Sequence, residues 1–132
     1  MREDTKPYET PGNRMCRERY ANLPLPWHDQ IAVPGFSDHK FVKKEWDVGG
    51  LEEGKEDFFL GSEITTWNAM EEVFGTFSMV QRWREAHADA VASGKEEDMV
   101  KKAIREMREI AGQDIKEVRV GRSCVLVMLK RE

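Results

Sequence analysis

Cysteine is scarce in this chain, with only Cys16 and Cys124 among 132 residues. The two lie far apart and form no Cys-x-x-Cys pair, which indicates reduced thiols rather than a disulfide framework. Reduced thiols are typical of cytoplasmic proteins, so we expect a cytoplasmic location. Cys124 stands in the apolar run SCVLVML and is expected to be a small buried residue, whereas Cys16 in RMCRER is expected to be an incidental surface thiol.

Long apolar runs, an excess of basic charge and reaction-specific motifs are also missing. No run approaches the roughly 20 apolar residues that cross a bilayer, and the charged N-terminus MREDTKPYET is not followed by the apolar segment of a secretory signal. The formal charge of −4 argues against nucleic acid as the main partner. Phosphate-binding glycine loops and the GxSxG, HExxH and CxxC motifs are absent, so no cofactor is implied.

Proline is absent after residue 34. The prolines are Pro7, Pro11, Pro24, Pro26 and Pro34. Because proline fixes φ and lacks an amide donor, residues 1–61 are expected to be mostly extended or irregular, with short strands at HKFVKKEW and EDFFL. Aromatic residues are spread along the same segment, which is unlike the composition of a disordered tail. We therefore expect an arm that lies along another surface.

The second half of the chain has regular periodicity. Ser93 and Glu96 have the spacing of a capping box, which predicts a helix start there, and Gly112 is expected to end that helix. Its apolar stripe comprises Val100, Ala103, Ile104, Met107, Ile110 and Ala111. A second helix is predicted over residues 62–94, with two helices broken at Gly75 as the alternative. The short ASGK connection predicts that the helices form an antiparallel hairpin.

Two β-branched runs flank Gly121 and Arg122 and predict a C-terminal β-hairpin. The second of these strands is apolar on both faces, so it needs cover on both sides. The predicted fold class is therefore α+β, with an extended, largely irregular N-terminal arm, an α-helical hairpin and a C-terminal β-hairpin. We expect two parts: the arm over residues 1–61 and the helical and β-hairpin module over residues 62–132.

Two histidine–acid pairs in the proline-rich segment are the weak catalytic candidates: His28, Asp29, Asp38 and His39. Such groups could bind a metal or supply a general base. The two histidines lack the close spacing of loop ligands such as HxH or HxxxH, so no metal site is predicted. His87 could add a third group, although a hydrogen-bonded histidine on a helix is the simpler interpretation.

These patterns favour a non-catalytic small accessory subunit of a cytoplasmic, hetero-oligomeric enzyme complex. Its arm would wrap a larger catalytic subunit, because prolines lower the ordering cost of binding and aromatic side chains bury large areas. The expected interface anchors are Tyr8, Tyr20, Trp27, Phe36, Phe41 and Trp46. The alternative is a small metal-assisted or acid–base enzyme that uses the histidine–acid pairs. An interaction protein of a phage or toxin system would share the arm and stays open as well.

Overall fold

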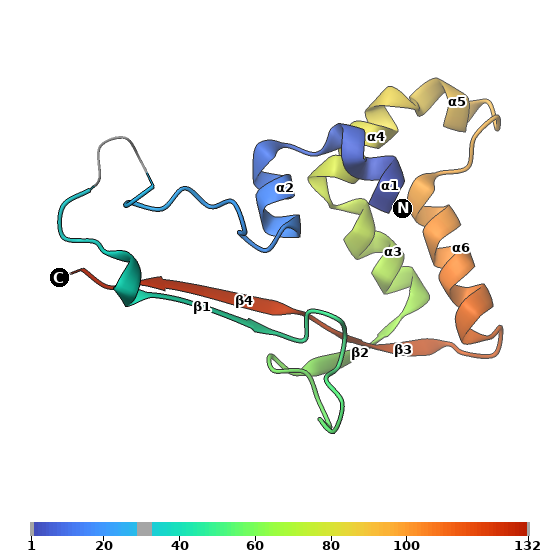
Figure 1. Cartoon of the computed structure of the whole chain (residues 1–132). Coiled ribbons are helices and arrows are strands. Elements are labelled where there is room, and N and C mark those ends of the chain that lie inside the picture. The colour runs from blue at the N-terminus through green and yellow to red at the C-terminus, as the bar shows by residue number, and fades with distance from the viewer. Residues whose placement is uncertain (1, 29–32, 132) are drawn as a thin grey trace. The chain divides into compact units, whose positions relative to one another are not determined.

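The computed structural model describes residues 2–28 and 33–131 and shows an α+β fold whose N-terminal region is largely non-regular, as predicted (Figure 1). The helices are α1 (Arg2–Thr5), α2 (Pro11–Arg17), α3 (Trp67–Gly75), α4 (Ser78–Ala86), α5 (Ala88–Ala92) and α6 (Met99–Ala111), with 3-10 turns η1 (Lys6–Tyr8) and η2 (Asp38–Lys40). The strands are β1 (Phe41–Trp46), β2 (Ser62–Thr66), β3 (Glu117–Gly121) and β4 (Cys124–Leu129). None of the helices within this described part is both long and apolar enough to cross a membrane.

The chain forms two compact units. The helical unit comprises Met1–Arg14 and Ile64–Arg119, and the ribbon unit comprises Met15–Glu63 and Val120–Glu132. This division differs from the expected boundary after residue 61 at both ends of the chain. The N-terminal residues belong with the helices because Tyr8 packs against the helical core, and the C-terminal residues belong with the arm because β4 pairs with β1.

Each strand in the second half of the chain pairs with a strand from the first half. β4 runs antiparallel to β1, from the pair Phe41 and Leu129 to the pair Trp46 and Cys124, and β3 is hydrogen-bonded to β2. The two C-terminal strands, β3 and β4, form on either side of residues 122–123. Each of them pairs with a strand that is distant in sequence, and not with the other. The strand expected in HKFVKKEW forms as β1, whereas EDFFL forms no strand.

The hydrophobic core of the helical unit lies between α3, α4 and α6. Its buried residues are Trp67, Val80, Trp83, Met99, Val100 and Ile104. Val80 and Val100 are fully buried, and α3 packs against α6 (Figure 1). The indole Nε1 of Trp67 donates a hydrogen bond of 2.7 Å to the carbonyl oxygen of Ile115, so the polar atom of this buried side chain is satisfied.

Helix α6 begins at Met99, and its N-cap is Asp98. The capping box predicted at Ser93 is wrong, because Ser93 instead ends α5. Asp98 Oδ1 accepts hydrogen bonds from the amides of Val100 (3.0 Å) and Lys101 (3.2 Å), and the Asp98 carboxylate also accepts two from the Arg84 guanidinium, at 2.7 and 3.0 Å. Burial by itself raises the pKa of Asp98, but the bonds from Arg84 and the backbone outweigh it and hold the pKa below its ordinary value.

The expected stop of α6 at Gly112 is confirmed, with φ of 108° at this C-cap.

The region predicted as one long helix contains a strand and three helices. Residues 62–66 form β2, since isoleucine and threonine favour extended backbone, and the Thr66 hydroxyl then caps α3. Helix α3 ends at Gly75, which confirms the alternative of a break at that residue. A Cβ at Gly75 would lie 3.1 Å from Nη1 of Arg84, so glycine leaves room for the guanidinium that binds Asp98.

Candidate functional site

The two faces of the β1–β4 ribbon differ in what covers them. Residues at odd positions of β1 share one face with Val125, Val127 and Leu129, and residues at even positions share the other with Cys124, Leu126 and Met128. Residues 19–28, which we call the extended segment, lie over the first face. Arg19 Nη1 is 3.5 Å from the Glu45 carboxylate, and the rings of Trp27 and Phe41 meet edge to face at 5.6 Å.

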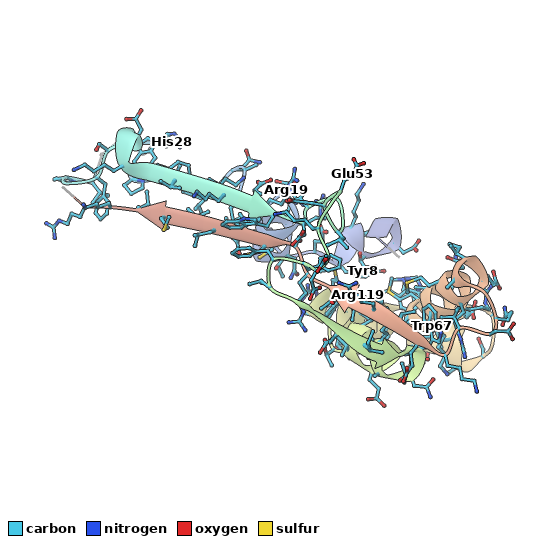
Figure 2. The ribbon with its side chains drawn as sticks, turned by 90° about the horizontal axis from the view of Figure 1, so that it is seen from below. Tyr8, Arg19, His28, Glu53, Trp67 and Arg119 are labelled. Carbon is cyan, nitrogen blue, oxygen red and sulfur yellow. The ribbon has the colours of Figure 1, made fainter. Side chains whose placement is uncertain are left out.

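This extended segment runs along the ribbon in the direction opposite to β1. Figure 2 shows Arg19 near the carboxyl end of β1 and His28 near its start. Leu25, between them, is the only apolar side chain that is buried in the described part of the ribbon unit. Lys43 also binds Glu45, at 2.8 Å. The hydrogen bond from Lys43 and the charge of Arg19 lower the pKa of the Glu45 carboxyl, although burial opposes the shift.

The second face of the ribbon exposes apolar side chains. Val42 and Met128 form a cross-strand pair and are 37% and 45% exposed, and Leu126 on the same face is 40% exposed. Lys44, opposite Leu126, is the only charged residue that β1 and β4 place on this face. We call this surface, formed by Val42, Lys44, Leu126 and Met128, the open face.

A loop after β1 adds further exposed apolar residues beside the ribbon. Asp47 is buried with φ of 55°, and its Oδ2 accepts a hydrogen bond of 2.6 Å from the amide of Phe59. The Phe59 ring stacks on Trp46, with centroids 4.2 Å apart. These contacts hold the loop against the end of β1 while Phe59 and Leu60 stay 56% and 62% exposed. The buried carboxylate thus positions an apolar surface.

The residues predicted as interface anchors lie in both units. Tyr20, Trp27, Phe36, Phe41 and Trp46 belong to the ribbon unit, and each is half-buried. Tyr8 belongs to the helical unit, where it packs against the core. The role of these aromatic residues as anchors stays a prediction. The open face adds residues that the prediction did not include, although the apolar character of both faces of β4 indicated that both needed cover.

Of the four residues in the histidine–acid pairs, the structure describes the side chains of two, His28 and Asp38. His28 is exposed and its ring contacts Trp27, and Asp38 is exposed in η2. Asp29 and the side chain of His39 lie outside the described residues. Among the residues that are described, no group of three or more His, Cys, Asp or Glu side chains could hold a metal ion. The alternative based on these four residues therefore stays a prediction.

His87 belongs to a hydrogen-bonded chain of three side chains in the helical unit. Its Nδ1 lies 2.6 Å from Oε2 of Glu96, and its Nε2 lies 2.8 Å from the hydroxyl of Tyr8. An ionised carboxylate only accepts, so the tautomer that fits this arrangement has its proton on Nδ1, and Nε2 can then accept from the Tyr8 hydroxyl. The Trp83 ring stacks on the imidazole, with centroids 4.4 Å apart.

The order hydroxyl, imidazole, carboxylate is one that can move a proton from the hydroxyl to the ring. It also fixes η1 to the helices, together with a hydrogen bond of 2.7 Å from Arg82 Nε to the carbonyl oxygen of Tyr8. His87 is hydrogen-bonded, as predicted, but it lies between α4 and α5 rather than inside a helix. Its partner Tyr8 lies far away in sequence, so no local pattern indicated the contact.

Comparison with known proteins provides no relative for this chain: no family model, no curated protein and no solved structure matches it.

Proposed function

We propose that this chain is a non-catalytic small subunit of a cytoplasmic, hetero-oligomeric enzyme complex, and that its ribbon unit binds the larger subunit. The observation that supports the proposal is the contrast between the two units. The helical unit has a hydrophobic core of its own, with both Val80 and Val100 fully buried. The described part of the ribbon unit buries one apolar side chain, Leu25, and exposes many others. These are Val33, Val42, Val48, Leu51, Phe59, Leu60, Leu126, Met128 and Leu129.

A two-stranded ribbon is marginally stable in water unless something packs on it. The extended segment covers one face, and the open face has no cover within the described residues. A larger subunit that packs on the open face and on Phe59 would supply the missing buried area. The aromatic residues of the segment would then serve as anchors, since a few such side chains carry most of the binding energy at an interface.

The test is an assembly assay with the larger subunit. The larger subunit is first isolated together with the tagged chain, and the complex is then reconstituted from the purified components. Val42→Asp places a carboxylate on the open face, and Val73→Asp places one on α3, where the valine is 53% exposed. We expect Val42→Asp to abolish or strongly weaken assembly and Val73→Asp to leave it unchanged. A chain that is a stable monomer without a partner, with a slowly exchanging ribbon, would contradict the proposal.

A second candidate function rests on the chain Tyr8–His87–Glu96. In this alternative the helical unit supplies an acid–base group to a reaction, in the complex or alone. His87→Gln and Tyr8→Phe distinguish the two functions. A loss of turnover with normal assembly and an unchanged melting temperature favours acid–base chemistry, whereas unchanged turnover with a lower melting temperature assigns the three residues to holding η1 in place.

A further inference from the structure

Among the described residues, no strand pairs with one edge of β4. Its other edge pairs with β1 along the whole strand, and no additional backbone hydrogen bond to residues 124–129 is formed within the described part of the chain. In a strand, alternate residues direct their amide and carbonyl groups to the same edge. The groups on the free edge of β4 must therefore pair with water or with a strand from elsewhere.

The sequence of β4 contains none of the features that protect an exposed edge. The strand reads CVLVML, without charge, proline or glycine. β1 reads FVKKEW and carries three charged residues, Lys43, Lys44 and Glu45. Charged side chains, lysine above all, are a common means of preventing edge-to-edge pairing. The ribbon thus has one protected edge, on β1, and one unprotected edge, on β4.

The residues that flank β4 are basic. Arg122 precedes the strand and its side chain is 81% exposed, in an ion pair of 3.7 Å with Glu63, which is 69% exposed. Lys130 and Arg131 follow the strand and are exposed. An extended peptide that pairs with β4 would therefore meet an apolar centre and a positive charge at each end. The complementary peptide is apolar in the middle and acidic at both ends.

We propose that β4 binds, by strand addition, an extended segment of the larger partner that has an apolar centre and an acidic residue at each end. This inference rests on the proposed function and names the chemistry of the partner. Main-chain hydrogen bonds would provide the affinity, and the charges at the two ends would select the segment and its register.

A second copy of the chain is the less favourable occupant. Antiparallel pairing of two β4 strands about their centre would place Arg122 of one copy opposite Arg131 of the other, and Ser123 opposite Lys130. The same unfavourable contact would occur at both ends of the pair. Like charges directly opposite each other destabilise a strand pair, so the flanks of β4 disfavour self-association.

The test uses the full chain and two synthetic peptides. The first is Glu-Val-Thr-Val-Thr-Val-Thr-Val-Glu, whose two glutamates are as far apart as Arg122 and Lys130, and the second has lysine in place of both glutamates. Binding is measured by isothermal titration at low salt, and amide exchange is followed residue by residue by NMR. We expect the acidic peptide to bind about tenfold more tightly than the lysine peptide and to slow exchange of the outward-facing amides of residues 124–129.

A charge-reversed chain is the matched control. Replacing Arg122, Lys130 and Arg131 by glutamate should reverse the preference between the two peptides while the β4 backbone stays the same. Equal binding of both peptides by the unmodified chain, or no protection of β4 by either, would overturn the inference. So would concentration-dependent dimers with a protected β4 in the absence of peptide, because the occupant would then be a second copy.

Failure of this inference can be separated from failure of the proposed function. In the reconstituted complex, slowed exchange around Trp27 and the open face with no change in β4 would leave the small-subunit proposal intact and remove strand addition. Loss of assembly after Val42→Asp with unaltered peptide binding would show that the open face and the β4 edge are separate contacts, and would support both proposals.

Discussion

Asp98 has two structural roles, and substituting it tests both. Asp98→Ala removes the side chain that caps α6 and binds the Arg84 guanidinium. Asp98→Asn keeps an oxygen that can accept from the helix amides but removes the charge, since asparagine caps helices about as well as aspartate. The two variants therefore separate the helix cap from the ion pair with Arg84.

The expected magnitude follows from the contacts. Loss of a good N-cap costs about 1 kcal/mol. The paired bonds to Arg84 add roughly 1–2 kcal/mol, because Asp98 is only 12% exposed while Arg84 is 34% exposed and remains partly hydrated. We thus expect Asp98→Ala to cost about 2–3 kcal/mol and Asp98→Asn roughly 1–2 kcal/mol, with Asp98→Ala lowering the melting temperature of the helical unit by about 10 °C or more.

The assay is thermal unfolding followed by tryptophan fluorescence, because Trp67 and Trp83 both lie in this core. Since the folded pKa of Asp98 is lowered, its contribution is complete above the ordinary aspartate pKa and is lost as the pH falls through the lower, folded value. The difference between the unmodified chain and Asp98→Asn should therefore shrink in acid. A shift below about 2 °C for Asp98→Ala at neutral pH would refute this account of how α6 begins.

Three further predictions concern other parts of the chain. Met107→Asp should lower the melting temperature far more than Ile110→Asp, because Met107 packs on the core and Ile110 is 87% exposed on the same helix. Equal effects of the two substitutions would mean that α6 has a different orientation. Trp27→Ala should weaken assembly by about 2 kcal/mol or more in a binding titration and leave the melting temperature of the helical unit unchanged. If Trp27→Ala instead unfolds the isolated chain, Trp27 belongs to a structural core. Gly121→Ala should accelerate amide exchange in the ribbon unit, because a Cβ there would overlap the Phe58 ring, whereas Gly49→Ala meets no atom within 4 Å and serves as the control.

The parts of the fold that depend on local sequence were predictable. The first part of the apolar stripe of α6, from Val100 to Met107, and the stop at Gly112 follow from helical periodicity and from the backbone freedom of glycine. The end of the predicted stripe does not hold, because Ile110 and Ala111 are exposed. The start of the same helix was not predictable in this way. Ser93 and Asp98 are both good N-caps, and Asp98 is the cap that also binds Arg84 on α4, a contact between separate helices.

The strand partners and the histidine contact could not be read from local patterns. β4 was recognised as a strand, but its pairing with β1 joins residues from opposite ends of the sequence. Tyr8 was recognised as an aromatic residue that needs a partner, yet the partner, His87, follows from packing of η1 against the core. The open face is predictable only in part, because the pattern of β4 shows that both faces are apolar but not which one the extended segment covers.

The long-range pairing of the strands has a consequence for synthesis of the chain on the ribosome. β1 is made long before β4, and β2 long before β3, so neither sheet can form until the second half of the chain has been translated. During that interval β1 has no strand to pair with, and its lysines help to keep it from pairing with other nascent chains. Helix α6 and its core can form earlier, since α3, α4 and α6 are close in sequence. The ribbon is therefore expected to be the last part to fold, and slow translation or premature termination should affect it before the helices.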